Sequence, residues 1–285
     1  MRFESLSETI RELYPETSLF ETLAVLITEF GEDPVIILVL ALVYWLYERE
    51  NTMTLASYVV AGIAFTLIVK TGFAMPRPPD DVWLIARDYD PYGFPSGHAF
   101  NAVIVYGGLI YLHDKLRNPL WLTGGIALIL AISISRVVLG VHYVGDIFVG
   151  ALVGIGFLLA IDQITGRNPL YGFALGVVLA IPAILISGGE TYGLMAFGAS
   201  VGGVVGTLQR NDTVSLDSKW EAGILVVGGV LFLTAVVLFQ ETIAPDNSPA
   251  VISAYAIIVW GVLMAPSGAA IVERHRNRVL RTLKS

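Results

Sequence analysis

Residues 135–165 read SRVVLGVHYVGDIFVGALVGIGFLLAIDQIT and join a polar cluster to a long apolar segment. Because a membrane-spanning helix needs about 20 mostly apolar residues, this stretch predicts a span over about 142–163. His142 and Asp146 are four residues apart at its start, so they share one helix face. An aspartate that binds one ring nitrogen raises the basicity of the other, as a nucleophilic histidine requires. The alternative is a polar pair that only satisfies a helix end.

Apolar segments of the same kind recur along the chain. The sequence is 55% hydrophobic and 14% charged, whereas soluble domains are about 25% charged. We therefore expect an all-α fold, a polytopic transmembrane helical bundle of about nine spans. The predicted spans are 33–48, 53–73, 97–113, 119–138, 142–163, 168–187, 191–209, 219–242 and 248–272. The net charge of −7 argues against a nucleic-acid partner, and the absence of cysteine excludes disulfides, thiolate catalysis and cysteine metal sites.

Four regions follow from this pattern. Residues 1–32 are predicted to form interfacial or re-entrant helices, because 4–13 is amphipathic and Leu19 to Phe30 is short for a span. A tenth span over Leu19 to Phe30 is the alternative. Residues 33–165 form the core that carries the polar clusters, 166–272 form additional C-terminal transmembrane helices, and 273–285 form a basic tail. The glycines of the third region favour close helix packing or a homodimer contact.

The distribution of lysine and arginine predicts the orientation in the membrane. One side of the predicted bundle holds most of the basic loop residues and the basic tail; the loop residues are Arg49, Lys115, Arg117, Arg167, Arg210 and Lys219. Cytoplasmic loops carry the excess of positive charge, so we expect this side and the C-terminus to be cytoplasmic. The polar clusters then lie on the extracytoplasmic face of the cell membrane.

Two further polar clusters flank the proline-rich loop that follows the 53–73 span. Lys70 lies near the end of that span, where an ionisable side chain is a functional candidate, although it could also reach the interface as an isolated lysine. Arg77 follows it and can bind phosphate through two hydrogen bonds. Ser96, Gly97 and His98 open the next span, where a capping serine and free backbone N–H groups favour an anion. Taken singly, a capping serine beside an incidental histidine is the simpler interpretation.

The three clusters are predicted to emerge on one side of the membrane. Lys70, Arg77 and Arg136 would then meet two histidines, an aspartate and the start of a helix. Three positive side chains in one pocket favour a multiply charged anion, and phosphate fits. The four histidines do not have metal-ligand spacing, so we expect no metal or other cofactor.

Together these residues resemble the three-part signature of the type-2 phosphatidic acid phosphatase superfamily, the lipid phosphate phosphatases. The signature K-x6-R-P, P-S-G-H and S-R-x5-H-x3-D stands complete as Lys70 to Pro78, Pro95 to His98 and Ser135 to Asp146. The resemblance covers roughly residues 20–165. It implies a six-helix phosphatase core.

The resemblance also implies a role for each residue. His142 would form a phosphohistidine, Asp146 would orient it, and His98 would act as general acid and then as general base. The phosphate would be bound by the remaining signature residues, which are Lys70, Arg77, Ser96, Gly97 and Arg136.

The substrate predicted from these features is a lipid phosphate with its tail in the bilayer. Polyprenyl diphosphate, phosphatidate and phosphatidylglycerophosphate are the candidates, and the first is favoured because it must be recycled at the outer face. One alternative is a phosphotransferase that uses an alcohol in place of water. Another is a transporter or scaffold in which the same site is vestigial.

Overall fold

The computed structural model describes residues 2–13, 18–85, 90–210, 219–243 and 248–282. The described residues are predominantly helical and contain no strand, in agreement with the predicted all-α class. The helices are α1 (Glu4–Leu13), α2 (Ser18–Glu29), α3 (Asp33–Leu46), α4 (Glu50–Phe73), α5 (Gly97–Ala102), α6 (Gly108–Leu112), α7 (Pro119–Val138), α8 (Val144–Thr165), α9 (Pro169–Ser187), α10 (Thr191–Gln209), α11 (Lys219–Ile243) and α12 (Ser248–Thr282). A 3₁₀ turn, η1 (Asp80–Val82), and a π-helical turn, η2 (Val103–Gly107), complete the set, and η2 joins α5 to α6 as one continuous helix.

Among the described residues, seven helices are long and apolar enough to cross a membrane. They are α4, α7, α8, α9, α10, most of α11 and the first part of α12. The segments Asp33–Leu46 and Gly97–Leu112 are apolar but shorter. The chain is thus a multi-pass membrane protein, and the exact number of nine spans stays a prediction.

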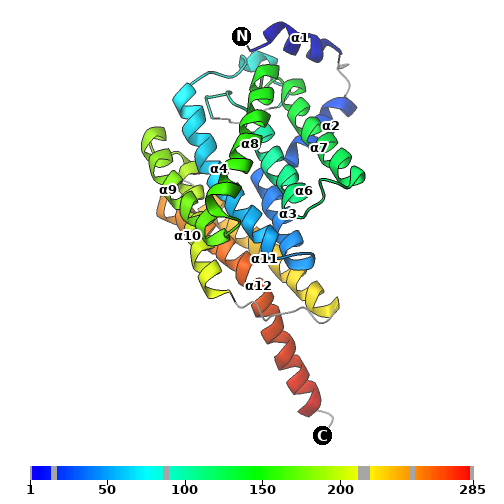
Figure 1. Ribbon diagram of the computed structural model, residues 1–285, viewed down its shortest axis with the longest axis vertical. Coiled ribbons are helices and arrows are strands. Elements are labelled where there is room, and N and C mark those ends of the chain that lie inside the picture. The colour runs from blue at the N-terminus through cyan, green and yellow to red at the C-terminus, as the bar shows by residue number, and fades with distance from the viewer. Residues whose placement is uncertain (1, 14–17, 86–89, 211–218, 244–247, 283–285) are drawn as a thin grey trace.

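The first predicted span, 33–48, corresponds to α3, which directly follows α2 in the chain. A three-residue link, 30–32, separates them, and α3 continues away from α2 toward the other end of the molecule (Figure 1). α2 packs along α7, and the carbonyl of Phe30 accepts a hydrogen bond of 2.7 Å from the hydroxyl of Tyr106, which lies well inside the α5–α6 helix. α2 therefore packs against the bundle, and its assignment as an interfacial or re-entrant helix stays a prediction.

The ends of several helices meet at one end of the bundle. α4 and α7 end there, and α5, α8 and α10 begin there, while α1 lies across this end (Figure 1). The C-terminus lies at the opposite end of the molecule (Figure 1). α12 remains helical to Thr282, so the predicted basic tail from 273 continues this helix as far as the structure describes it.

The C-terminal helices pack directly on the core. α10 and α12 run close together because Gly198 and Gly202 face the backbone of α12, where an added Cβ would lie 2.2 Å and 2.1 Å from carbonyl oxygens. α9 packs on α4, and Gly172 leaves room there for Ser57. Gly172, Gly198 and Gly202 thus allow close helix packing within the chain.

Candidate active site

His142 lies in the tight turn between α7 and α8. Gly140 adopts φ +79° in this turn, and a Cβ there would lie 2.1 Å from the carbonyl oxygen of Val82, so the position requires glycine. The backbone N–H of His142 donates to the carbonyl of Arg136 at 3.3 Å. The side chain is 2% exposed, so the turn places the imidazole inside the protein.

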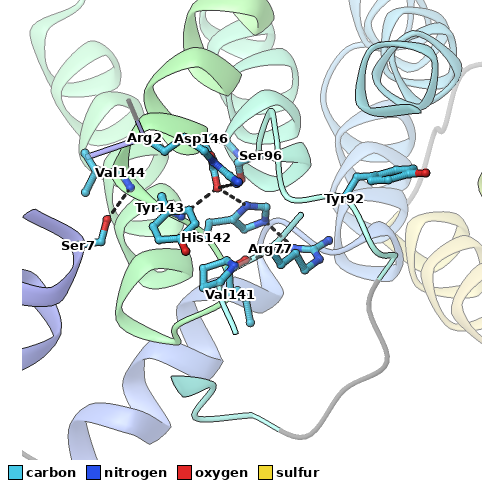
Figure 2. A network of polar contacts seen from close by, with 12 residues as sticks. Arg2, Ser7, Arg77, Tyr92, Ser96, Val141, His142, Tyr143, Val144 and Asp146 are labelled. Carbon is cyan, nitrogen blue, oxygen red and sulfur yellow. Dashed lines mark hydrogen bonds and ion pairs between the residues drawn. The ribbon is translucent and has the colours of Figure 1, made fainter. Parts of the chain in front are cut away.

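The two ring nitrogens of His142 have different partners (Figure 2). Nδ1 lies 3.4 Å from Oδ2 of Asp146, and Nε2 lies 3.0 Å from NH1 of Arg77. A guanidinium can only donate, so Nε2 must be the acceptor and the proton of the neutral ring belongs on Nδ1, facing Asp146. Burial, together with the positive charges of Arg77 and Arg136, holds the pKa of His142 well below its ordinary value. The ring is therefore neutral at pH 7, with a lone pair on Nε2.

Asp146 is fixed from several directions. Arg2 binds it through two hydrogen bonds, Nε to Oδ1 and NH2 to Oδ2, each of 2.7 Å (Figure 2). The backbone N–H of Tyr143 donates to Oδ2 at 2.9 Å. The guanidinium of Arg2 also lies 4.6 Å from the centre of the Tyr143 ring. Asp146 itself is 0% exposed and lies in a fixed, dry position beside Nδ1 of His142, which has no hydrogen-bond partner among the described residues.

The predicted phosphate-binding cations gather beside His142. Nζ of Lys70 and NH2 of Arg77 both contact Oδ2 of Asp90, at 2.7 Å and 2.8 Å. Burial favours a higher pKa for Asp90, but Lys70 and Arg77 outweigh it and lower the pKa below the ordinary value. Arg136 is 1% exposed, and its NH1 donates to the hydroxyl of Thr28 at 2.8 Å. A carboxylate of the chain thus sits between two of the three cations.

The residues of the segment Ser96–His98 have different positions: Ser96 is bound within the fold, and Gly97 and His98 line the cavity. The hydroxyl of Ser96 caps α5 by accepting from the N–H of Ala99 at 3.5 Å, and its own N–H donates to the carbonyl of Asp146 at 3.0 Å. That N–H is therefore engaged within the fold, contrary to the predicted contact with phosphate. Gly97 and His98 face the cavity, and Nε2 of His98 lies 3.2 Å from Oε1 of Glu32.

A cavity of about 90 Å³ joins these side chains. Six of the eight predicted site residues line it, and these are Lys70, Arg77, Gly97, His98, Arg136 and His142. Asp146 and Ser96 lie behind the lining and support it. Among the described residues, no group of three or more His, Cys, Asp or Glu side chains is arranged to hold a metal ion. The cavity presents three cations and two histidines, together with four carboxylates, which are Glu32, Asp33, Asp90 and Glu190.

The comparisons with known proteins place the site residues within one matched region. The PAP2 superfamily matches residues 51–169, which include every predicted site residue. The chain belongs to the PAP2 superfamily. An undecaprenyl-diphosphatase of Sulfolobus acidocaldarius is 31% identical over 161 residues, covering 55% of this chain and 76% of that protein. No solved structure matches the chain significantly.

Two other PAP2 relatives carry phosphatase names. A phosphatidylglycerophosphatase B of Bacillus subtilis is 37% identical over 71 residues, which are 22% of this chain and 34% of that protein. A dihydrosphingosine 1-phosphate phosphatase of Saccharomyces cerevisiae is 29% identical over 170 residues, which are 56% of this chain and 41% of that protein. The names of these relatives have in common a phosphatase that acts on a phosphate ester or diphosphate of a lipid. The family and these relatives support a phosphoric ester hydrolase.

Several site residues of this PAP2 protein were missed by the sequence reasoning. Arg2 and Glu32 precede the matched region, and Glu190 and Tyr192 at the start of α10 follow it, yet Glu32, Glu190 and Tyr192 line the cavity and Arg2 holds Asp146. Only the tertiary fold brings them to the site. Thr66 is different, because it lies one turn before Lys70 on the same helix face, where spacing alone could have indicated it. Its hydroxyl lines the cavity and has no hydrogen-bond partner among the described residues.

Proposed function

We propose that the protein hydrolyses a lipid phosphate, with polyprenyl diphosphate as the favoured substrate, through a phosphohistidine on His142. The observation that carries the proposal is the position of His142, which lines a cavity with Lys70 and Arg136 and has its Nε2 3.0 Å from NH1 of Arg77. Phosphoryl transfer depends mainly on positioning and on stabilisation of charge on the phosphate oxygens. Lys70, Arg77 and Arg136 are placed to supply that stabilisation.

The reaction would proceed in two displacements. Nε2 of His142 attacks phosphorus and the bond to the leaving oxygen breaks, while His98, protonated beside Glu32, donates a proton to that oxygen and becomes neutral. Water then attacks the phosphohistidine, His98 accepts a proton from the water, and phosphate leaves from Nε2. During the first step Arg77 must turn from Nε2 toward the phosphate oxygens, because its NH1 covers the lone pair in the ligand-free protein.

We also infer that the cavity opens to the extracytoplasmic face and that the C-terminus is cytoplasmic. The helix ends that line the cavity lie at one end of the molecule, and the C-terminus lies at the other end (Figure 1). Most basic loop residues are at the end that carries the C-terminus. The chain has no cysteine, so single cysteines report the topology without interference. In intact cells, a membrane-impermeant maleimide should label Asp81→Cys, beside the cavity, and should spare Leu116→Cys; the reverse pattern would refute this orientation.

The activity is tested by phosphate release from detergent-purified protein. Farnesyl diphosphate, phosphatidate, phosphatidylglycerophosphate and an aryl phosphate form the substrate panel, with and without excess EDTA. We expect release that survives EDTA, is inhibited by vanadate and falls by about 10⁵-fold or more in His142→Ala. His113→Ala is the matched control, because His113 lies at the other end of the bundle and contacts Thr52 and Leu109.

The intermediate has its own test. Protein mixed with substrate labelled in the phosphate and quenched in alkali should retain label on wild-type protein and none on His142→Ala. Activity in purified His142→Ala equal to that of wild type would refute the mechanism. Label transfer from the intermediate to an added alcohol, in preference to water, would instead indicate a phosphotransferase.

A further inference from the structure

A second cavity adjoins the catalytic cavity. Its volume is about 80 Å³, and four helices form it: α3, α4, α10 and α12. Asp33 and Ile63 line both cavities, so the two meet at these residues. α10 and α12 lie outside the region that matches the PAP2 superfamily, so this space belongs to the additional helices of this chain.

The walls of the second cavity are almost entirely hydrocarbon. Ile36, Met53 and Ile258 are among the lining side chains, and each is at most 2% exposed. Asp33, where the two cavities meet, is the one charged residue in the lining. A polar group moved into such a space would lose its hydrogen bonds to water, whereas a hydrocarbon chain would not.

Two hydroxyls at the far end do not change this character. Tyr44 donates to the backbone carbonyl of Leu263 at 3.3 Å, and Thr52 donates to the backbone carbonyl of Glu48. Both of these hydroxyl protons are thus bound within the fold, and Tyr255 of α12 is the third hydroxyl-bearing residue in the lining. The cavity therefore suits the apolar part of a ligand whose charged part lies next door.

The cavity is also long and narrow. Its α3 wall extends from Asp33 to Tyr44, over which a helix rises about 16 Å. The volume of about 80 Å³ is small, which favours one hydrocarbon chain over two side by side. Asp33 lies at the end near the cations, so the long axis leads away from the phosphate site toward the opposite end of the bundle.

We propose that this second cavity binds the hydrocarbon tail of the substrate while its phosphate lies against His142, and that it selects lipids with a single chain. The proposal rests on the proposed function, which it deepens by naming the substrate class. Single-chain lipid phosphates such as prenyl diphosphates would use the cavity, and diacyl lipids would not. The helices α10 and α12 would then determine specificity for the reaction carried out by the PAP2 core.

The first test is a series of dimethylallyl, geranyl and farnesyl diphosphates. Burial of each CH₂ group contributes about 0.8 kcal/mol, so kcat/KM should rise by about tenfold or more with each added isoprene unit until the cavity is full. Ala56→Phe places a ring in the cavity and should reduce kcat/KM for farnesyl diphosphate by about tenfold or more, with dimethylallyl diphosphate unaffected. The matched control is Ala127→Phe, which adds the same ring on the exposed face of α7.

Two further measurements keep the test decisive. Hydrolysis of an aryl phosphate, which has no tail, reports whether Ala56→Phe is folded, and Ala199→Leu is a milder second variant in the same cavity. Dioctanoyl phosphatidate, with two chains, should be a poorer substrate than farnesyl diphosphate and insensitive to Ala56→Phe.

The outcomes separate this inference from the proposed function. Equal chain-length dependence in wild type, Ala56→Phe and Ala199→Leu would overturn the tail site and leave the phosphatase function standing. If no substrate released phosphate, the proposed function would fail. The tail site would then be tested by measuring the binding of prenyl diphosphates. Farnesyl diphosphate should bind His142→Asn protein more tightly than geranyl diphosphate does, and the additional substitution Ala56→Phe should remove the difference; an unchanged difference would overturn the proposal.

Discussion

The two histidines of the site are supported in opposite ways. His142 faces Asp146, a fully buried carboxylate that is clamped by Arg2. His98 faces Glu32, whose side chain is 21% exposed and lies at the break between α2 and α3. A nucleophile must keep one orientation, whereas a residue that donates and then accepts a proton must follow two different oxygens. The rigid pair and the adjustable pair therefore match the two roles proposed for them.

The largest effect is expected from a change in the rigid pair, His142 and Asp146. In Asp146→Asn the carboxylate that fixes the Nδ1 proton is lost, so a ring with its proton on Nε2 becomes competitive and cannot attack. We expect kcat to fall by about 10³- to 10⁴-fold, with a smaller change in KM. Single-turnover phosphate release measures the chemical step directly. Asp114→Asn, an exposed position at the other end of the bundle, should retain full activity.

The adjustable pair should give a smaller effect that depends on the substrate. General acid catalysis contributes about 10² to 10⁴-fold, and most of it is needed when the leaving oxygen is basic. His98→Ala should therefore slow a prenyl monophosphate by about 10³-fold and an aryl phosphate, which has a better leaving group, by about tenfold. A plot of log kcat against leaving-group pKa should be steeper in the variant. Equal slopes would assign His98 to binding and not to proton transfer.

Sequence reasoning found the parts of the site that are close in the chain. Lys70 with Arg77, Ser96 to His98, and Arg136 to Asp146 each lie within one helix end and its loop, and the hydropathy pattern placed all three at one end of the bundle. Residues that reach the site from elsewhere had no local signal. Arg2 and Glu190 are a basic and an acidic residue in polar segments, and only the folded chain brings them to the cavity.

The N-terminal helices show the same limit. α2 has 12 residues, including Glu21 and Glu29, and is too short to span a bilayer, so the pattern alone favoured an interfacial or re-entrant helix. The structure places α2 and α3 one after the other along the chain (Figure 1). Gly31 and Glu32 of their link line the cavity beside His142. A hydropathy pattern indicates the length of each apolar segment. It contains no information on how two short helices pack relative to each other.

Arg2, which lies outside the family signature, allows a further test of the difference between the two histidines. Its two bonds to Asp146 exist only in the rigid pair, so Arg2→Ala should loosen His142 and leave His98 as it is. We expect kcat to fall by about 10- to 100-fold with an unchanged leaving-group dependence, and the melting temperature to fall because a buried carboxylate loses its partner. Arg2→Lys should recover stability more than kcat, since an ammonium cannot make both bonds. A wild-type kcat in Arg2→Ala would show that Tyr143 alone is sufficient to hold Asp146.

The smallest expected effect concerns the third carboxylate, Asp90, which occupies the cations that substrate needs. Phosphate must displace its Oδ2 from Lys70 and Arg77, so Asp90→Asn should lower KM several-fold at nearly constant kcat. The backbone carbonyl of Asp90, which accepts from Nε of Arg77 at 2.7 Å, is unaffected by the substitution and keeps the arginine in place.

The pH dependence separates this competition from a structural role of Asp90. Because the two cations hold its pKa below the ordinary value of 3.8, the carboxylate stays ionised in the folded protein, and acidification to about pH 5 should not reproduce the low KM of Asp90→Asn. Competition by a carboxylate thus predicts a KM gap between wild type and variant that persists from neutral pH to about pH 5. A higher KM in the variant would mean instead that Asp90 orients Lys70 and Arg77 for the phosphate, as Asp146 is proposed to orient His142. The rigid part of the site would then include these two cations.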